Sequence, residues 1–302
     1  PEPLSTPSPN SVHLSISGDG RRIAYVQQIR RSNLHKVAFD PAQKTLMGQP
    51  APITEGSRWE SSPDLSPDGQ WLAYYSGGKQ EDIFVIRTDG TALRQLTDDP
   101  HKDRIPRWSP DGKRIAFYSD RSGRYEIWTI QADGSGLQQM TYTSGQTPSE
   151  AAWSPDGTRL AYHQRPNTFI MEVGKPWKEQ SLRPLGTAAD SKERFVATSW
   201  SFDGKKLAGD RRRADGSIAG IAVYSMDSQR FETLTDFGAL PFWLKDNKTL
   251  LFSHQGKLYV ADSQSKKTQE VRSTTPPGIG GRLAVSRDNR LIYFSRESSE
   301  AD

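Results

Sequence analysis

The chain has no cysteine among its 302 residues. Disulfide bonds and thiolate-based zinc sites are therefore excluded, although the redox compartment is left open. No run of apolar residues approaches the roughly 20 that a membrane-spanning helix requires. No secretory signal is visible, and the chain starts at Pro1 without a methionine. We therefore expect a leader or an anchor to precede it in the full-length protein.

Apolar residues are also few, at 33% of the chain, yet 10% of the residues are aromatic and eight are Trp. A disordered chain lacks such large side chains, so the composition indicates thin sheets packed face to face. The net charge of +4 comes from 40 basic and 36 acidic residues, which are interspersed. Local basic clusters such as Arg211-Arg212-Arg213 are typical of loops and edge strands. We expect no nucleic-acid partner for this domain.

One short motif recurs along the whole chain. Its clearest copy reads Trp108-Ser109-Pro110-Asp111-Gly112 and is followed by a β-rich run, Arg-Ile-Ala-Phe-Tyr. The aspartates of the seven copies are Asp19, Asp68, Asp111, Asp156, Asp203, Asp246 and Asp288. They lie 42 to 49 residues apart, which is the length of one four-stranded propeller blade.

Each position of the motif has a physical role. Asp-Gly supplies the positive φ values of a tight hairpin turn. The residue before the serine is apolar, as at Trp153, and should pack between neighbouring blades. Third strands are expected over 82–86, 126–130 and 257–261. No segment of ten or more residues has helical periodicity, so the chain is predicted to be all-β.

Seven motifs predict a seven-bladed β-propeller of four-stranded antiparallel blades, forming a single domain over residues 1–302. Six blades are the alternative. An open solenoid would need polar capping repeats at its ends. Instead, the last motif has two strands, 282–285 and 290–295, before the chain stops. Residues 2–6 look like a fourth strand, so we expect the N-terminal strand to close the last blade, with a third strand missing or beyond the end.

The stretch from Trp108 to Asp120-Arg-Ser-Gly, followed by Glu126-Ile-Trp128, closely resembles the TolB-like β-propeller repeat, a relative of the WD repeat. The resemblance covers nearly the whole chain. It implies a bacterial protein in the periplasm or otherwise outside the cytoplasm, because TolB is a periplasmic partner-binding protein. TolB has six blades and an extra α/β domain, whereas this chain has seven motifs and no such domain.

Other proteins with similar propellers suggest further roles. Some precede the hydrolase domain of prolyl-oligopeptidase-type peptidases, and others form the extracytoplasmic end of bacterial regulators. Oligogalacturonate lyases share the repeat and use a histidine-rich metal site. This chain has no Gly-x-Ser-x-Gly pentapeptide, and its five histidines are scattered over different repeats. We therefore expect no catalytic residue, no bound metal and no cofactor.

The sequence thus favours a non-catalytic, monomeric scaffold that binds a protein or peptide at the mouth of the channel. It could serve as the sensory or interaction domain of a larger bacterial protein. The enzymatic alternative is a carbohydrate-active lyase or hydrolase with its site in the central channel, suggested by the lyase resemblance and by His101 beside Asp103. A purely structural spacer is the third hypothesis.

Binding is expected in the loops that lead from each fourth strand to the next first strand, because irregular loops on a rigid scaffold carry recognition. These loops combine aromatic residues, arginine and mixed charge, the composition of a recognition patch. The candidate binding residues are Arg58, Trp59, Glu60, His101, Asp103, Arg104, Glu150, Arg194, Phe195 and Phe242.

Overall fold

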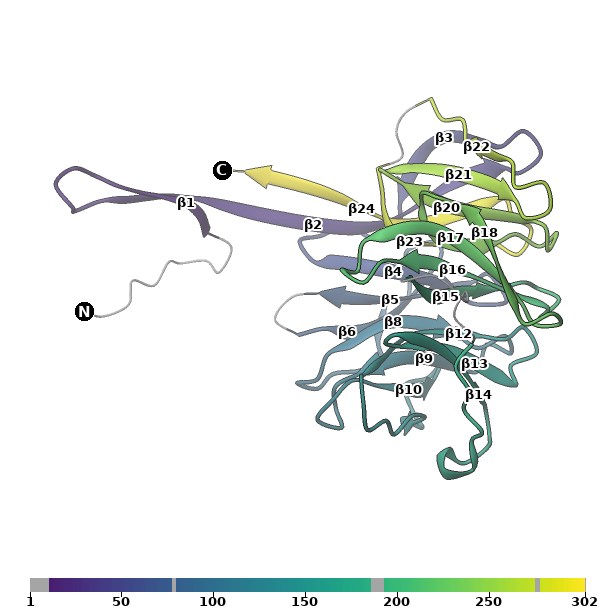
Figure 1. Cartoon of the computed structure of the whole chain (residues 1–302). Coiled ribbons are helices and arrows are strands. Elements are labelled where there is room, and N and C mark those ends of the chain that lie inside the picture. The colour runs from purple at the N-terminus through teal and green to yellow at the C-terminus, as the bar shows by residue number, and fades with distance from the viewer. Residues whose placement is uncertain (1–10, 78–79, 186–192, 275–277, 302) are drawn as a thin grey trace.

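The computed structural model describes residues 11–77, 80–185, 193–274 and 278–301. Antiparallel sheets follow one another around a central axis (Figure 1). Within these residues, the one helical element is a short 3₁₀ turn, Trp177–Glu179. The prediction of an all-β propeller is therefore confirmed.

Four blades are separate sheets, and the strand order in each is that of a propeller blade. The first contains β8 (Asp103–Trp108), β9 (Arg114–Ser119), β10 (Glu126–Gln131) and β11 (Gln138–Gln139). The second contains β12 (Pro148–Trp153), β13 (Arg159–Gln164) and β14 (Asn167–Glu172). The third contains β15 (Arg194–Trp200), β16 (Lys206–Arg212), β17 (Ile218–Ser225) and β18 (Arg230–Thr235). The fourth contains β19 (Ala239–Trp243), β20 (Thr249–His254), β21 (Lys257–Asp262) and β22 (Thr268–Glu270).

A nine-stranded sheet holds the remaining strands. One part is a blade made of β4 (Trp59–Leu65), β5 (Trp71–Gly77), β6 (Asp82–Arg87) and β7 (Arg94–Gln95). The other contains β23 (Ile279–Val285), β24 (Leu291–Ala301), β2 (Ile23–Asp40) and β3 (Thr45–Pro52). A parallel bridge between Ser32 and Trp59 joins the two parts. Four blades are thus separate sheets and the remaining described strands share one sheet, so the prediction of seven separate blades is wrong.

The two ends of the chain close the ring together. Strand β24 pairs with β2 from Leu291↔Ala38 to Ala301↔Gln28, and β2 pairs in turn with β3. The N-terminal part of the chain thus supplies both the third and the fourth strand of the last blade. The expected closure occurs, but through β2 and β3, and the third strand is not missing. Residues 2–6, which were expected to close the blade, lie outside the described residues.

The first motif copy accounts for the wrong count. Its Asp19 turn joins β1 (Ser11–Ile16) to the start of β2, and this hairpin projects away from the ring (Figure 1). Ile16 and Ile23 are paired across the hairpin and are 62% and 41% exposed. The motif encodes a hairpin turn, and a hairpin becomes part of a blade only when further strands pack against it.

The motif turns share one pattern of hydrogen bonds. In the copy at Ser154, the hydroxyl donates to Asp156 at 2.5 Å and accepts the Arg159 N–H at 2.9 Å. Asp156 also accepts the Thr158 N–H at 3.0 Å. These bonds favour the carboxylate and lower the pKa of Asp156 to about 2, with the Ser154 hydroxyl as the largest cause. The turn is therefore fixed by side chains as well as by the glycine.

The motif also joins each blade to the next. The indole of Trp153 donates to the carbonyl of Arg107 in the preceding blade at 3.0 Å. The Arg114 guanidinium of the preceding blade lies 5.3 Å from the Trp153 ring centre, a cation–π contact between blades. A Cβ on Gly157 would lie 3.7 Å from the ring of Pro110. The expectation that the apolar motif residue packs between blades is confirmed.

Candidate functional site

The first strand of each blade faces the channel and is irregular in the middle. Register shifts interrupt the pairing of these strands with their neighbours. Ser62, Ile105, Glu150 and Leu240 have φ values of 52° to 58° there. Such values are uncommon for residues with a side chain and are typical of a β-bulge, which re-aims the side chains that follow it.

A pocket of about 330 Å³ lies in the channel immediately after these bulges. The first strand of every blade contributes to its wall, and the motif turns form its rim. Pro67, Pro110 and Pro155 occupy corresponding rim positions, and Phe202 replaces the proline in the next copy. The pocket therefore opens at the end of the channel that carries the Ser-Pro-Asp-Gly turns.

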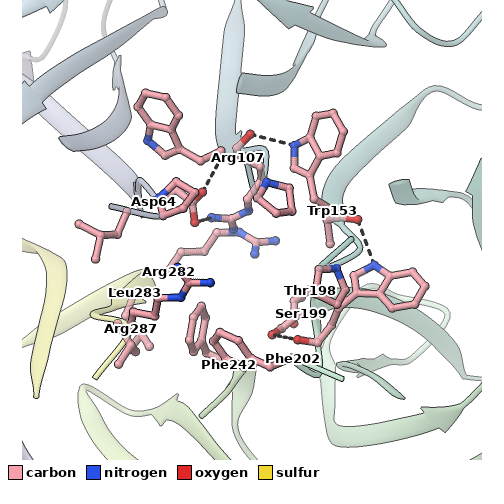
Figure 2. A pocket seen from close by; sticks show the side chains of 18 of the residues that line it. Asp64, Arg107, Trp153, Thr198, Ser199, Phe202, Phe242, Arg282, Leu283 and Arg287 are labelled. Atoms are coloured by element: carbon pink, nitrogen blue, oxygen red, sulfur yellow. Dashed lines mark hydrogen bonds and ion pairs between the residues drawn. The ribbon is translucent and has the colours of Figure 1, made fainter. Parts of the chain in front are cut away.

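One side of the pocket is charged. Arg107 of β8 donates through Nη1 to Asp64 of β4 at 3.2 Å, and the other Asp64 oxygen accepts the Trp108 N–H at 2.7 Å. Burial raises the pKa of Asp64, although the charges of Arg107 and Arg282 act in the opposite direction. Figure 2 shows the side chains of Arg107 and Arg282 both extending toward the middle of the pocket.

Arg282 also forms an ion pair with Glu150. The two residues come from β23 and β12, which lie on opposite sides of the ring. Their side chains are only 7% and 15% exposed. Arg282 lines the pocket, whereas its partner Glu150 does not; we call this buried ion pair the floor of the pocket.

The other side of the pocket is apolar and weakly polar. Figure 2 shows Phe242 and Phe202 together, opposite Asp64 and Arg107. Thr198 and Ser199 of β15 lie beside them, and their hydroxyl groups bind the Pro241 carbonyl at 2.9 Å and the Trp243 N–H at 3.2 Å. The pocket thus places arginine on one wall and aromatic rings on another.

Eight of the ten predicted binding residues, all except Glu150 and Phe242, lie near the start of the inner strands, at the opposite end of the channel. Arg58 is exposed and its guanidinium lies 5.5 Å from the Phe84 ring centre. Trp59 is half-buried, and Glu60 is buried and accepts a hydrogen bond from Thr54. Burial raises the pKa of Glu60.

His101, Asp103 and Arg104 lie near the start of β8. They form ion pairs with residues of their own blade and of the preceding one. Asp103 is fully buried and accepts from Arg121 at 2.6 Å, while Arg104 forms two hydrogen bonds with Glu81. The Nδ1 atom of His101 lies 3.6 Å from Asp120. His101 and Asp103, the pair behind the enzymatic alternative, therefore face different partners.

The remaining candidates are divided between the two ends of the channel. Arg194 donates to the Arg213 carbonyl at 3.1 Å, and the Phe195 ring packs edge-on against Phe231 with centres 4.9 Å apart. Glu150 reaches the floor of the pocket, and Phe242 alone of the ten lines it. Binding by these loops stays a prediction.

The pocket residues that sequence reasoning missed carry a simple signal. Asp64, Arg107 and Ser199 each come one residue before the apolar motif residue, as does Phe242. Neighbouring strand residues point to opposite faces, and in these copies the residue before the apolar motif residue lines the pocket. Arg282 could not be placed by this rule, because the bulge in β23 falls at Gly281.

Two further observations concern only the described part of the chain. No group of three or more histidine, aspartate or glutamate side chains there is arranged to hold a metal ion. No helix there is long and apolar enough to span a membrane.

Several known proteins share short stretches of this sequence. A *Bacillus subtilis* protein described as the uncharacterized peptidase YuxL is 35% identical over 100 residues, which cover 32% of this chain and 15% of the relative. The Tol-Pal system protein TolB of *Syntrophus aciditrophicus* is 39% identical over 57 residues, covering 19% and 13%. The chain therefore spans only a small part of these relatives.

Solved structures share the fold over most of the chain. A structure of a putative TolB from *Agrobacterium tumefaciens* matches with a TM-score of 0.68 and 16% identity, covering 88% of this chain and 99% of that one. TolB from *Acinetobacter baumannii* matches with a TM-score of 0.62 and 18% identity, covering 89% and 65%. The model of the TolB beta propeller domain family matches residues 4–192. This is more than half of the chain, which therefore belongs to the TolB beta propeller domain family.

Proposed function

We propose that the chain is a single, non-catalytic propeller domain that binds a segment of a protein or peptide in its channel pocket. The observation that carries the proposal is the pocket itself, because every blade contributes to it and it combines arginine with aromatic rings. Arginine and aromatic side chains are enriched where binding energy is concentrated. A location in the periplasm, or elsewhere outside the cytoplasm, is part of the proposal and is supported by the family.

The rigidity of the wall supports this role. The inner strands are held to one another by hydrogen bonds between blades, such as the one that the Trp108 N–H donates to Asp64. A site built on strands loses little conformational freedom when a ligand binds, so more of the interaction energy appears as affinity. Arg104 and Asp103 of the predicted loop surface are likewise bonded to their neighbours, but they do not line a pocket.

Selection of random displayed peptides on the purified protein tests the proposal. Phe202 is 38% exposed at the pocket rim, so Phe202→Asp should leave the fold intact while placing a charge where an apolar group is expected. Leu137→Asp is the matched control, because Leu137 is 42% exposed and is not part of the pocket. We expect selected peptides to bind the wild type and the control, and to lose binding to Phe202→Asp. Equal binding to all three proteins would show that the peptides bind another surface, and the predicted loops would be the next candidate.

A further inference from the structure

The balance of charge in the pocket indicates the chemistry of its ligand. Its lining contains three arginines, Arg107, Arg282 and Arg287, and one acidic residue, Asp64. Glu150 neutralises Arg282 from the floor. The one positive charge that remains uncompensated is that of Arg287, which is exposed at the rim and gives the mouth of the pocket a net positive charge.

The buried arginines retain hydrogen-bond donors. Arg107 is 8% exposed, and its Nε is buried with no hydrogen-bond partner. Arginine has five N–H donors. The ion pair of Arg107 uses its Nη1 atom, and the ion pair of Arg282 uses its Nη2 atom. The Nε atom itself is closed to solvent, so a ligand acceptor would bond to the remaining terminal N–H groups of the two guanidinium groups.

The electrostatic environment points in the same direction. Burial lowers the pKa of Arg282 well below its usual range, and the positive charge of Arg107 lowers it further. Two guanidinium groups that oppose each other's charge stabilise an anion placed between them. Carboxylates match the planar fork of arginine and accept two parallel hydrogen bonds.

The rest of the wall limits which anion is favoured. Phe242 and Phe202 face the arginines across the pocket, and Leu283 lies beside Arg282 (Figure 2). A bare inorganic ion would leave these surfaces in contact with water. The volume of about 330 Å³ is at the small end of ligand sites, so it suits one or two side chains rather than a folded element.

We propose that the channel pocket recognises a carboxylate carried next to an apolar side chain, with Arg107 and Arg282 binding the carboxylate and Phe242 and Phe202 contacting the apolar group. This inference rests on the proposed function and names the ligand chemistry of the same site. The carboxylate can be the C-terminus of a peptide or an aspartate or glutamate side chain.

Three short probes test the inference on the wild-type protein by isothermal titration calorimetry. They are acetyl-Ala-Ala-Phe with a free C-terminal acid, the same peptide as its amide, and acetyl-Ala-Asp-Phe amide. We expect at least one acidic probe to bind at least about tenfold more tightly than the neutral amide, since charge-assisted hydrogen bonds are stronger than neutral ones. The acidic probe that binds more tightly identifies the source of the carboxylate. Equal binding of all three probes, or no binding by either acid, would overturn the inference.

A pair of variants assigns the preference to the arginines. Asp64→Asn combined with Arg107→Gln removes the charge of Arg107 without leaving a buried aspartate unpaired. Arg230→Gln, in the exposed outer strand β18, removes the same charge far from the channel. The preference for acid over amide should disappear in the double variant and persist in the control; if the double variant does not fold, the three-probe comparison still decides. Displayed peptides that need Phe202 but show no carboxylate preference would leave the proposed function standing and refute this inference.

Discussion

Arg282 of β23 and Glu150 of β12 form an ion pair across the channel, between blades on opposite sides of the ring. Each blade otherwise packs mainly against its two neighbours. The pair therefore joins strands that belong to two different sheets. A buried pair of this kind is sensitive to the loss of either partner.

Removing one member of this pair should be more harmful than replacing both. Glu150→Gln leaves Arg282 buried without its counter-charge, and we expect a loss of about 3–5 kcal/mol in the free energy of unfolding. Glu150→Leu combined with Arg282→Met should recover most of that loss. Urea denaturation of the three proteins measures the difference. A single variant as stable as the wild type would show that the pair is unimportant for the fold.

Replacing the serine of the turn motif should lower the stability of the fold in the ring but not in the projecting hairpin. Ser154 is fully buried, and Ser154→Ala removes the acceptor of the Arg159 N–H, at an expected cost of about 1–2 kcal/mol. Ser17→Ala removes the corresponding bond to the Arg22 N–H outside the ring and should leave the midpoint of thermal unfolding unchanged. Thermal melts of both variants decide the matter. An equal loss in the two variants would place the first motif in a blade after all.

Closure of the ring should depend on β2. Phe39 is 2% exposed and packs in the core cluster that contains Ile292 and Phe294 of β24. Phe39→Ala should lower the free energy of unfolding by about 3–5 kcal/mol, the usual cost of deleting a large buried ring. Met47→Ala, in the adjacent strand β3 but 56% exposed, is the control and should have little effect. Urea denaturation compares the two, and a negligible change for Phe39→Ala would argue against closure by β2.

His163 should make the fold sensitive to mild acid. Burial, followed by the charges of Arg194 and Arg212, lowers the pKa of His163 to about 4. The unfolded chain therefore takes up this proton near pH 6.5, whereas the folded chain takes it up only near pH 4. Stability is lost as the pH falls through this range, by about 2 kcal/mol at pH 5 from this residue.

Replacing His163 isolates its contribution. The variant His163→Gln should show a smaller decrease in stability between pH 7 and pH 5 than the wild type, measured by urea denaturation at each pH. His254→Gln is the control, because His254 is half-buried at the turn between β20 and β21 of another blade. An identical pH dependence in wild type and His163→Gln would mean that the proton does not couple to unfolding through this residue.

The sequence was most informative about local structure. The Asp-Gly turns, the β-rich runs and the third strands at β6, β10 and β21 follow from turn chemistry and alternation. The number of blades does not, because the Asp19 hairpin has the same local chemistry as the others and differs only in having no blade around it. The decisive pairing, β24 with β2, joins residues more than 250 positions apart and has no local signature.

The candidate site was harder to foresee for a related reason. Loops were expected to carry binding because they are irregular, but several of their charged residues, such as Asp103 and Arg104, are engaged in ion pairs. The pocket instead lies between the inner strands, with the motif turns at its rim. Its charged residues are brought together by bulges at positions such as Ile105. A bulge shifts the alternation by one residue, so a strict period of two assigns the wrong face beyond it.

The pairing of β24 with β2 also determines how the ring would respond to mechanical force. The strands are antiparallel, so the beginning of β2 and the end of β24 leave the ring on the same side (Figure 1). Tension applied between these two points would peel the strands apart one hydrogen-bonded pair at a time, instead of shearing all pairs at once. The pairing of β24 with β2 would consequently open at low force. The remaining blades, which are continuous hairpins, would still hold together.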